Sequence, residues 1–355
     1  MRLTIDKSIK EIPYYPKAAL YGGDSGWVRL SSNENPNGPS PKAVESIVES
    51  VFALNRYPES EYELKSALAG KYALKPENII IGNGSNEIIE TSFRALRYEG
   101  KDEALLPAPS FAFYPIAAKI YGYRPKIVPL RDLKIEPEAM ADEIGERTRI
   151  VILNNPNNPT GTIFEDAQFR RFLERLPDEI LVVVDEAYAE FVDSPAFPRS
   201  TDYIADHPVL ILRTFSKAYG LAGLRVGYGI AGQEIVSYLE RTKQPFSVNM
   251  MALVAAKAAL TDERYLKTVL EGNRSGKSYL YRALTEMGVP FYPSEANFFL
   301  IKVGPGADDV TKRLFEAKVL VRSMSAYDLP DFIRVTVGTA DENRAFIEAL
   351  RRSLP

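Results

Sequence analysis

Residues 181–188 read LVVVDEAY, and this stretch constrains the fold more strongly than any other part of the chain. A run of apolar residues without polar alternation is typical of a strand that is covered on both faces, as in a mainly parallel α/β sheet. Such a strand would deliver Asp185 to its carboxyl end. A buried carboxylate there needs a partner, because burial alone raises its pKa. A metal ion in a nucleotide site is one candidate partner, but the chain has no G-x-x-x-x-G-K-[ST] motif. The other candidate partner for the Asp185 carboxylate is a protonated pyridine nitrogen.

Further apolar runs flank this strand and alternate with amphipathic stretches from about residue 60 to residue 230. The strand candidates are residues 78–81, 104–107, 126–129, 149–153, 180–184, 209–212 and 226–230. Beyond about residue 245 the pattern changes to long helical stretches over 249–287, two strand candidates at 297–303 and 332–337, and a last helix from Asp341. The pattern predicts an α/β fold with a second, smaller unit.

Three parts of the chain are expected. Residues 1–28 are rich in turn formers and read as an N-terminal arm laid on another surface. Residues 46–245 would form a large domain with a mainly parallel sheet sandwiched by helices. Residues 29–45 and 246–355 would form a smaller α+β domain.

Composition excludes several classes of function. The 355 residues carry a formal charge of −3, which does not favour nucleic acid or a membrane surface as partner. Cysteine is absent and His207 is the single histidine, so no disulfide, thiol nucleophile or multi-histidine metal site is expected. The N-terminus lacks the apolar segment of a signal peptide, and no apolar run is long enough to cross a bilayer. A cytoplasmic enzyme without a metal is predicted.

The second chemical signal is a lysine in residues 214–220, which read TFSKAYG. Lys217 is flanked by the hydroxyls of Thr214 and Ser216, and Arg225 follows. This set suits a phosphate while leaving an amine to attack a carbonyl, and pyridoxal phosphate is a carbonyl compound with its own phosphate. The segment predicts a Schiff-base lysine, although an ordinary surface lysine is the alternative.

Two loops add to this prediction. Residues 79–87 read IIIGNGSNE, a strand, a glycine-rich turn and a helix start that suit either a phosphate cradle or a plain turn. Residues 154–161 read NNPNNPTG, and two Asn-Pro steps demand a stiff, extended loop at the end of a strand. Such loops hold side chains where α/β sheets bind ligands.

Taken together, the chain resembles the pyridoxal-phosphate aminotransferases of fold type I (class I/II), and among them the histidinol-phosphate aminotransferase group. The similarity runs in order through residues 30–41, 56–58, 82–87, 155–161, 185–191, 214–228 and 332–339. It implies pyridoxal 5′-phosphate as cofactor and covers most of the chain.

The resemblance also implies roles for individual residues. Lys217 would carry the cofactor and move the proton during catalysis, Asp185 would pair with the ring nitrogen, and Tyr188 and Asn158 would bond the ring oxygen. The cofactor phosphate would be held by Ser85, Asn86, Thr214, Ser216 and Arg225. Tyr57 would reach that phosphate from the neighbouring subunit, so a homodimer with shared active sites is expected.

Substrate contacts are implied by the same resemblance. Arg334 would bind an anionic group bidentately, with Arg322 beside it, and Tyr14 and Asn33 would lie near the substrate. One departure is visible: Phe111 stands where the family often has a ring-stacking tyrosine. Phe111 would stack on the cofactor but has no hydroxyl to donate.

The implied reaction is transamination between a small amino donor and a 2-oxo acid. Histidinol phosphate with 2-oxoglutarate, in histidine biosynthesis, is the first expectation. An aromatic amino-acid aminotransferase is the alternative, because Tyr14, Tyr15, Phe111 and Tyr114 would suit a phenyl ring as well as an imidazole. A phosphoamino-acid decarboxylase is an alternative of another reaction class.

Overall fold

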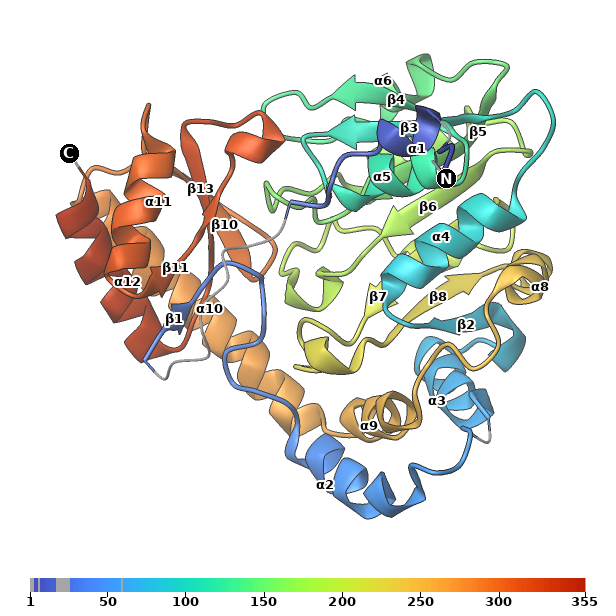
Figure 1. The fold of residues 1–355 in the computed structure, drawn as a ribbon, viewed down its shortest axis with the longest axis horizontal. Coiled ribbons are helices and arrows are strands. Elements are labelled where there is room, and N and C mark those ends of the chain that lie inside the picture. Colours follow the sequence, from blue (N-terminus) through green and yellow to red (C-terminus); the bar gives the residue numbers. More distant parts are fainter. Residues whose placement is uncertain (1–2, 6, 17–25, 59, 355) are drawn as a thin grey trace.

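The central element is a seven-stranded sheet (Figure 1). The computed structural model describes residues 3–5, 7–16, 26–58 and 60–354. The strand order is β2-β8-β7-β6-β5-β3-β4, and β8 runs antiparallel to both of its neighbours while the other pairs are parallel. The strands are β2 (Ile79–Gly82), β3 (Glu103–Ala108), β4 (Arg124–Pro129), β5 (Thr148–Asn154), β6 (Leu181–Asp185), β7 (Val209–Thr214) and β8 (Gly227–Ala231). The predicted, mainly parallel sheet is confirmed.

Helices cover both faces of this sheet, which explains the uninterrupted apolar strands. Along β6, Val182 and Val184 enter one core, whereas Leu181 and Val183 enter the core on the opposite face. The first core also contains side chains of α3 (Tyr62–Tyr72), α6 (Pro137–Asp142) and α7 (Asp166–Leu173). The second contains side chains of α4 (Ser85–Ala95), α5 (Phe113–Ile120) and α8 (Gln233–Thr242).

A smaller four-stranded antiparallel sheet, ordered β12-β13-β10-β9, lies beside the large one (Figure 1). Its strands are β9 (Phe291–Tyr292), β10 (Phe298–Lys302), β12 (Arg322–Ser323) and β13 (Phe332–Thr336). It shares a core with α10 (Glu263–Glu286), α11 (Ala307–Glu316) and α12 (Ala340–Ser353). A two-stranded parallel pair, β1 (Val28–Arg29) with β11 (Val319–Leu320), joins this unit. The smaller α+β unit expected from the sequence is therefore present.

The connecting helices belong to the first core. Helix α2 (Pro41–Ser50) is capped at its N-terminus by Ser40, whose side chain accepts a hydrogen bond from the Ala43 amide and donates one to Asp262. Ala43 packs in the core that also holds Ala252 of α9 (Met250–Leu260). The domain boundaries at 45/46 and 245/246 stay a prediction; in the structure α2 packs on α9, and both helices contribute to the core on one face of the large sheet.

The remaining elements are short. The N-terminal helix α1 (Lys7–Lys10) contacts α5, and residues 17–25 of the expected arm lie outside the described residues. The 3-10 helices are η1 (Val51–Ala53), η2 (Pro76–Asn78), η3 (Ala189–Phe191), η4 (Ser200–Tyr203), η5 (Ala222–Leu224) and η6 (Ser325–Tyr327). None of the helices described is both long and apolar enough to span a membrane.

Candidate active site

A cavity of about 320 Å³ lies where the carboxyl ends of β5, β6 and β7 face the smaller sheet. Of the predicted site residues, it gathers all except Tyr57, Tyr14 and Tyr114. Its lining includes Asn33, Ser85, Asn86, Phe111, Asn158, Asp185, Tyr188, Thr214, Ser216, Lys217, Arg225, Arg322 and Arg334. Residues far apart in sequence thus meet at the edge of the sheet where α/β folds bind ligands.

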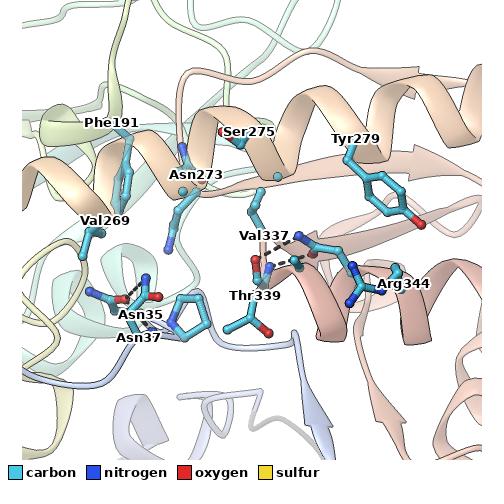
Figure 2. Close-up of a pocket in the computed structure, with 17 residues that line it drawn as sticks. Asn35, Asn37, Phe191, Val269, Asn273, Ser275, Tyr279, Val337, Thr339 and Arg344 are labelled. Atoms are coloured by element: carbon cyan, nitrogen blue, oxygen red, sulfur yellow. Dashed lines mark hydrogen bonds between the residues drawn. The ribbon is translucent and has the colours of Figure 1, made fainter.

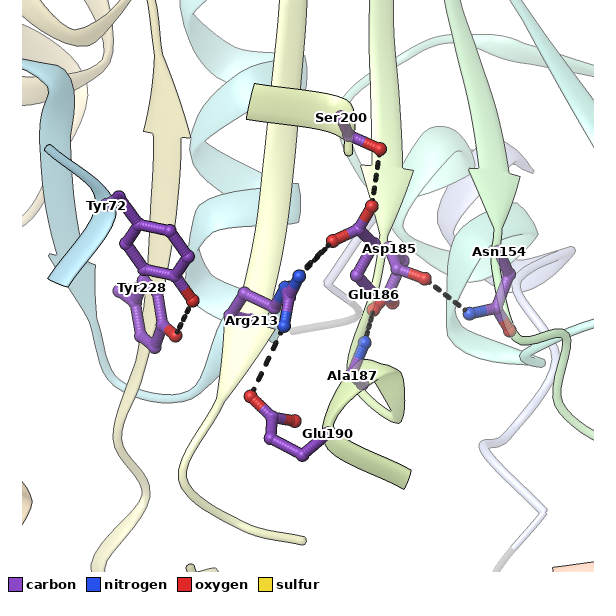
Figure 3. A network of polar contacts seen from close by, with 9 residues as sticks. All are labelled: Tyr72, Asn154, Asp185, Glu186, Ala187, Glu190, Ser200, Arg213 and Tyr228. Carbon is purple, nitrogen blue, oxygen red and sulfur yellow. Dashed lines mark hydrogen bonds and ion pairs between the residues drawn. The ribbon is translucent and has the colours of Figure 1, made fainter. Parts of the chain in front are cut away.

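Asp185 is the buried acid of the cavity. It is 3% exposed, its Oδ2 accepts a hydrogen bond of 2.8 Å from the Tyr114 hydroxyl, and its Oδ1 accepts one of 3.1 Å from the Ala187 amide. The Asn154 side chain donates to the backbone carbonyl of Asp185 at 2.9 Å (Figure 3). Burial raises the pKa of the Asp185 carboxyl to about 6 in spite of these donors. The carboxylate is therefore short of positive charge, which a cationic ligand would supply.

Lys217 is the amine of the cavity and follows directly on β7. Its Nζ donates to the Ser32 carbonyl at 3.0 Å and lies 5.7 Å from the centroid of the Tyr188 ring. Burial first, and the nearby guanidinium of Arg334 second, lower the pKa of Lys217 to about 8. About a tenth of this amine is therefore neutral at pH 7, far more than for an ordinary lysine, and the neutral form is the one that a nucleophile or base requires.

One end of the cavity is built for an anion. Helix α4 begins at Ser85, so its N-terminal N–H groups lie at this end of the cavity. The Arg225 guanidinium donates to the Ser216 hydroxyl at 3.2 Å. Gly84 has φ +73, and a Cβ there would lie 2.6 Å from the Arg225 guanidinium. A Cβ at Gly227 would lie 2.5 Å from the Ser85 amide nitrogen. Both glycines keep space around backbone N–H groups, a positive charge and hydroxyls, which suits a phosphate.

The smaller sheet contributes two arginines to the opposite side. Arg322 on β12 and Arg334 on β13 are directly paired across the strands, so their side chains share one face. Arg334 is 6% exposed and donates to the Asn158 side chain and, at 2.8 Å, to the Ser31 carbonyl. Its Nε has no hydrogen-bond partner among the described residues. This buried guanidinium retains a donor for an anion.

Two of the predicted residues lie elsewhere within this chain. The Tyr57 side chain is 78% exposed, with its ring centroid 4.9 Å from that of Phe246. Tyr14 is fully exposed, and its neighbour Tyr15 lines the cavity instead, edge-on to Phe111 at 6.2 Å. The assignment of Tyr14 stays a prediction; within this chain it is Tyr15 that faces the cavity, in the part of the arm where Arg322 bonds the Pro16 carbonyl.

Tyr114 also differs from expectation. It was expected to face a substrate ring, but it is completely buried and donates to Asp185. Sequence reasoning missed this role, and it also missed Asn154 and Tyr327 as cavity residues. The one available signal was the position of Asn154 at the end of an apolar strand. Tyr188, expected to face a ring oxygen, has a hydroxyl that accepts a bond of 3.0 Å from Asn33.

A second cavity of about 320 Å³ lies between α10 and the start of α12 (Figure 2). Asn35, Asn273, Val337 and Thr339 are among its lining residues. It shares no lining residue with the first cavity, and none of its lining residues was assigned a role in catalysis or binding from the sequence. The candidate site is therefore the first cavity.

Residues 25–350 match the family described as aminotransferase class I and II. The match covers more than half of the chain, and the fold and the lysine–aspartate cavity agree with it. The chain belongs to the class I and II aminotransferase family, and the resemblance drawn from its motifs is confirmed.

Particular relatives are similar over nearly the whole length. The chain is 44% identical to the histidinol-phosphate aminotransferase of Moorella thermoacetica over 92% of this chain and 85% of that protein. It is 43% identical to histidinol-phosphate aminotransferase 2 of Carboxydothermus hydrogenoformans, covering 92% and 91% respectively. Among solved structures, the histidinol-phosphate aminotransferase of Sinorhizobium meliloti in complex with pyridoxal-5′-phosphate superposes with a TM-score of 0.89 at 27% identity, covering 99% and 97%.

Proposed function

We propose that this enzyme transfers the amino group of histidinol phosphate to 2-oxoglutarate, with pyridoxal 5′-phosphate as cofactor. The observation that carries the proposal is the cross-strand pair of Arg322 and Arg334, which places two guanidiniums above the cavity of Lys217. The similarity to enzymes named histidinol-phosphate aminotransferase supports the same substrate.

The cavity fits this cofactor in three respects. Asp185 is a buried carboxylate that lacks positive charge, and a protonated ring nitrogen supplies it. The space kept by Gly84 and Gly227 beside Arg225 and the start of α4 suits the phosphate. Phe111 lines the cavity and offers an apolar ring face.

When bound, the cofactor links covalently to an amine and withdraws electrons from the carbon next to it. Lys217 would use its neutral Nζ first to hold the cofactor and, once released, to accept the proton from the substrate carbon. The Ser32 carbonyl, 3.0 Å from Nζ, would orient the amine and accept its hydrogen bond when it is charged. Asp185 would stay ionised and paired with the protonated ring nitrogen during the whole reaction.

The two arginines would recognise the anionic end of each substrate. Histidinol phosphate carries a phosphate where an amino acid carries its carboxylate, so one site must accept both groups. Arg334 would bind either anion through its guanidinium, which lines the cavity, and Arg322 would turn from the Pro16 carbonyl to the larger phosphate. Tyr15, which lies edge-on to Phe111, would cover the substrate from the arm.

A homodimer with shared active sites is part of the proposal. Tyr57 is exposed within one chain and packs against Phe246, and it would reach the cofactor phosphate of the neighbouring subunit. Exposed apolar side chains precede it in the sequence: Val48, Phe52 and Leu54 are 60%, 91% and 61% exposed. Such exposed apolar side chains, when they gather in one patch, are typical of a protein interface.

The test is a half-reaction screen on the purified enzyme with bound cofactor. Histidinol phosphate is expected to change the cofactor spectrum at a far lower concentration than phenylalanine or tyrosine. Arg322→Gln should weaken the response to histidinol phosphate by about tenfold or more, as loss of a charged contact predicts, whereas the exposed Arg171→Gln should not. A stronger response to phenylalanine or tyrosine would identify an aromatic aminotransferase, and release of an amine with carbon dioxide would identify a decarboxylase.

A further inference from the structure

The carboxylate of Asp185 is held by a side chain that the roles above leave unused. Tyr114, from α5, is completely buried and donates its hydroxyl to Asp185 Oδ2 at 2.8 Å. The other oxygen, Oδ1, accepts only a longer bond of 3.1 Å from the Ala187 amide. The hydrogen bond from Tyr114 is therefore the shorter of the two that fix the orientation of this carboxylate.

We propose that Tyr114 is a positioning residue for the transamination: its hydroxyl keeps Asp185 ionised and turned so that a free lone pair faces the ring nitrogen of the cofactor. This inference rests on the proposed function, since it concerns the same cavity. Tyr114 acts through Asp185 and is not assigned a contact with the substrate.

The charges around Asp185 explain why one donor matters. Glu186, the next residue in the chain, raises the pKa of Asp185 by repulsion, while Lys217, from the segment after β7, lowers it. Burial is the largest influence and raises that pKa, and the Tyr114 bond is the largest influence that lowers it. The hydroxyls of Tyr114 and Tyr188 stay neutral, because burial raises the pKa of each. Without the Tyr114 hydroxyl, Asp185 keeps its proton to higher pH, and a neutral acid holds a protonated ring nitrogen poorly.

The chain offers a matched control for removal of this hydroxyl. Tyr123 is also buried, at 4% exposure, and packs in the same core cluster as Tyr114. Its hydroxyl has no hydrogen-bond partner among the described residues. Tyr123→Phe therefore removes a buried tyrosine hydroxyl from the same core without touching Asp185.

The experiment compares Tyr114→Phe and Tyr123→Phe as holoenzymes. Tyr114→Phe should lower kcat by about tenfold, leave KM for the amino donor within about twofold, and move the acid limb of the kcat profile upward by about one pH unit. Tyr123→Phe should match the wild type in all three. Equal profiles for the two variants would overturn the inference.

A second comparison separates positioning from a general structural role. Tyr114→Phe should also weaken cofactor binding, but in an Asp185→Asn background it should cause no further loss of cofactor affinity, because its effect passes through the carboxylate. An equal loss in both backgrounds would contradict this. If Tyr114→Phe fails to fold by near-ultraviolet circular dichroism, 3-fluorotyrosine at position 114, which is a stronger donor, should move the acid limb downward, and an unchanged limb would refute the inference.

The outcome also distinguishes this inference from the proposed function. Failure of the proposed function appears in the wild type, as a cofactor spectrum that no amino donor changes. Failure of the inference appears in an active wild type whose Tyr114→Phe variant behaves like Tyr123→Phe.

Discussion

Replacement of Arg213 by methionine should destabilise the protein far more than loss of an exposed arginine. Arg213 on β7 pairs with Glu186, which follows β6, at 2.6 Å, and with Glu190 of η3 at 3.4 Å (Figure 3). Glu186 follows Asp185 in sequence and Arg213 precedes Thr214. The ion pair therefore ties the segment that carries the acid to the segment that carries Lys217.

The magnitude follows from burial. The Glu186 side chain is 1% exposed and that of Arg213 is 16% exposed. Removing one partner of a buried pair costs about 3–5 kcal/mol of unfolding free energy, because the other charge is left without compensation. Arg171 pairs with Glu138 at 2.6 Å, but these side chains are 56% and 32% exposed. Arg171→Met should therefore cost only about 0–1 kcal/mol.

The pH dependence has a definite sign. Burial raises the pKa of Glu186, although Arg213 opposes the shift. A folded pKa above the unfolded value means that stability is present at low pH and is lost as the pH rises through the folded pKa. Removing Arg213 raises the pKa of Glu186 further, so the defect of Arg213→Met should be larger at about pH 8 than at about pH 5.5.

The assay is urea unfolding followed by far-ultraviolet circular dichroism on the cofactor-free variants. Adding Glu186→Gln to Arg213→Met should recover part of the loss, because the unpaired charge is removed. A defect for Arg213→Met within about 1 kcal/mol of that for Arg171→Met at about pH 8 would refute the reasoning.

Four further outcomes are expected. Lys217→Ala should lose the borohydride-reducible link to the cofactor, and a reducible adduct in that variant would reject the assignment. In the cofactor-free protein, burial raises the pKa of Asp185 from 3.8 to about 6, so ionisation of this carboxyl should cost about 3 kcal/mol of stability as the pH rises through that range, and Asp185→Asn should lack this part of the pH dependence. Acetylation of Lys217 in the cofactor-free protein should titrate with the pKa of about 8 that burial gives it, measured by mass spectrometry against exposed Lys267, and identical titrations would contradict the burial effect. Tyr57→Phe should weaken cofactor retention in the dimer, and a fully active monomer would exclude a shared site.

The sequence predicted those parts of the site that depend on local pattern. Asp185 was found because an uninterrupted apolar strand ends at it, and the structure shows that this strand is buried on both faces. Lys217 was found because hydroxyls flank it within one short segment. Both predictions depend only on residues that are adjacent in the sequence, so they do not require knowledge of how distant segments pack.

The remainder depended on contacts between distant segments. Tyr114 and Asp185 are 71 positions apart, and no periodicity links a helix residue to that carboxylate. Tyr15, and not Tyr14, faces the cavity within this chain, in the part of the arm where Arg322 bonds Pro16, which lies 306 positions away. The helical pattern over 249–287 predicted the helix α9, but it did not say which of the two cores of the large sheet would receive it.

The cross-strand register of Arg322 and Arg334 has a consequence for redesign of the enzyme. The anchors proposed for the cofactor come from residues 57–225, whereas the proposed anion receptor comes from a hairpin-like unit within residues 322–334. We expect donor preference to be retargeted by changing this short unit alone. Insertions between the two strands are the changes to avoid, since a shift of one position would send one guanidinium to the opposite face.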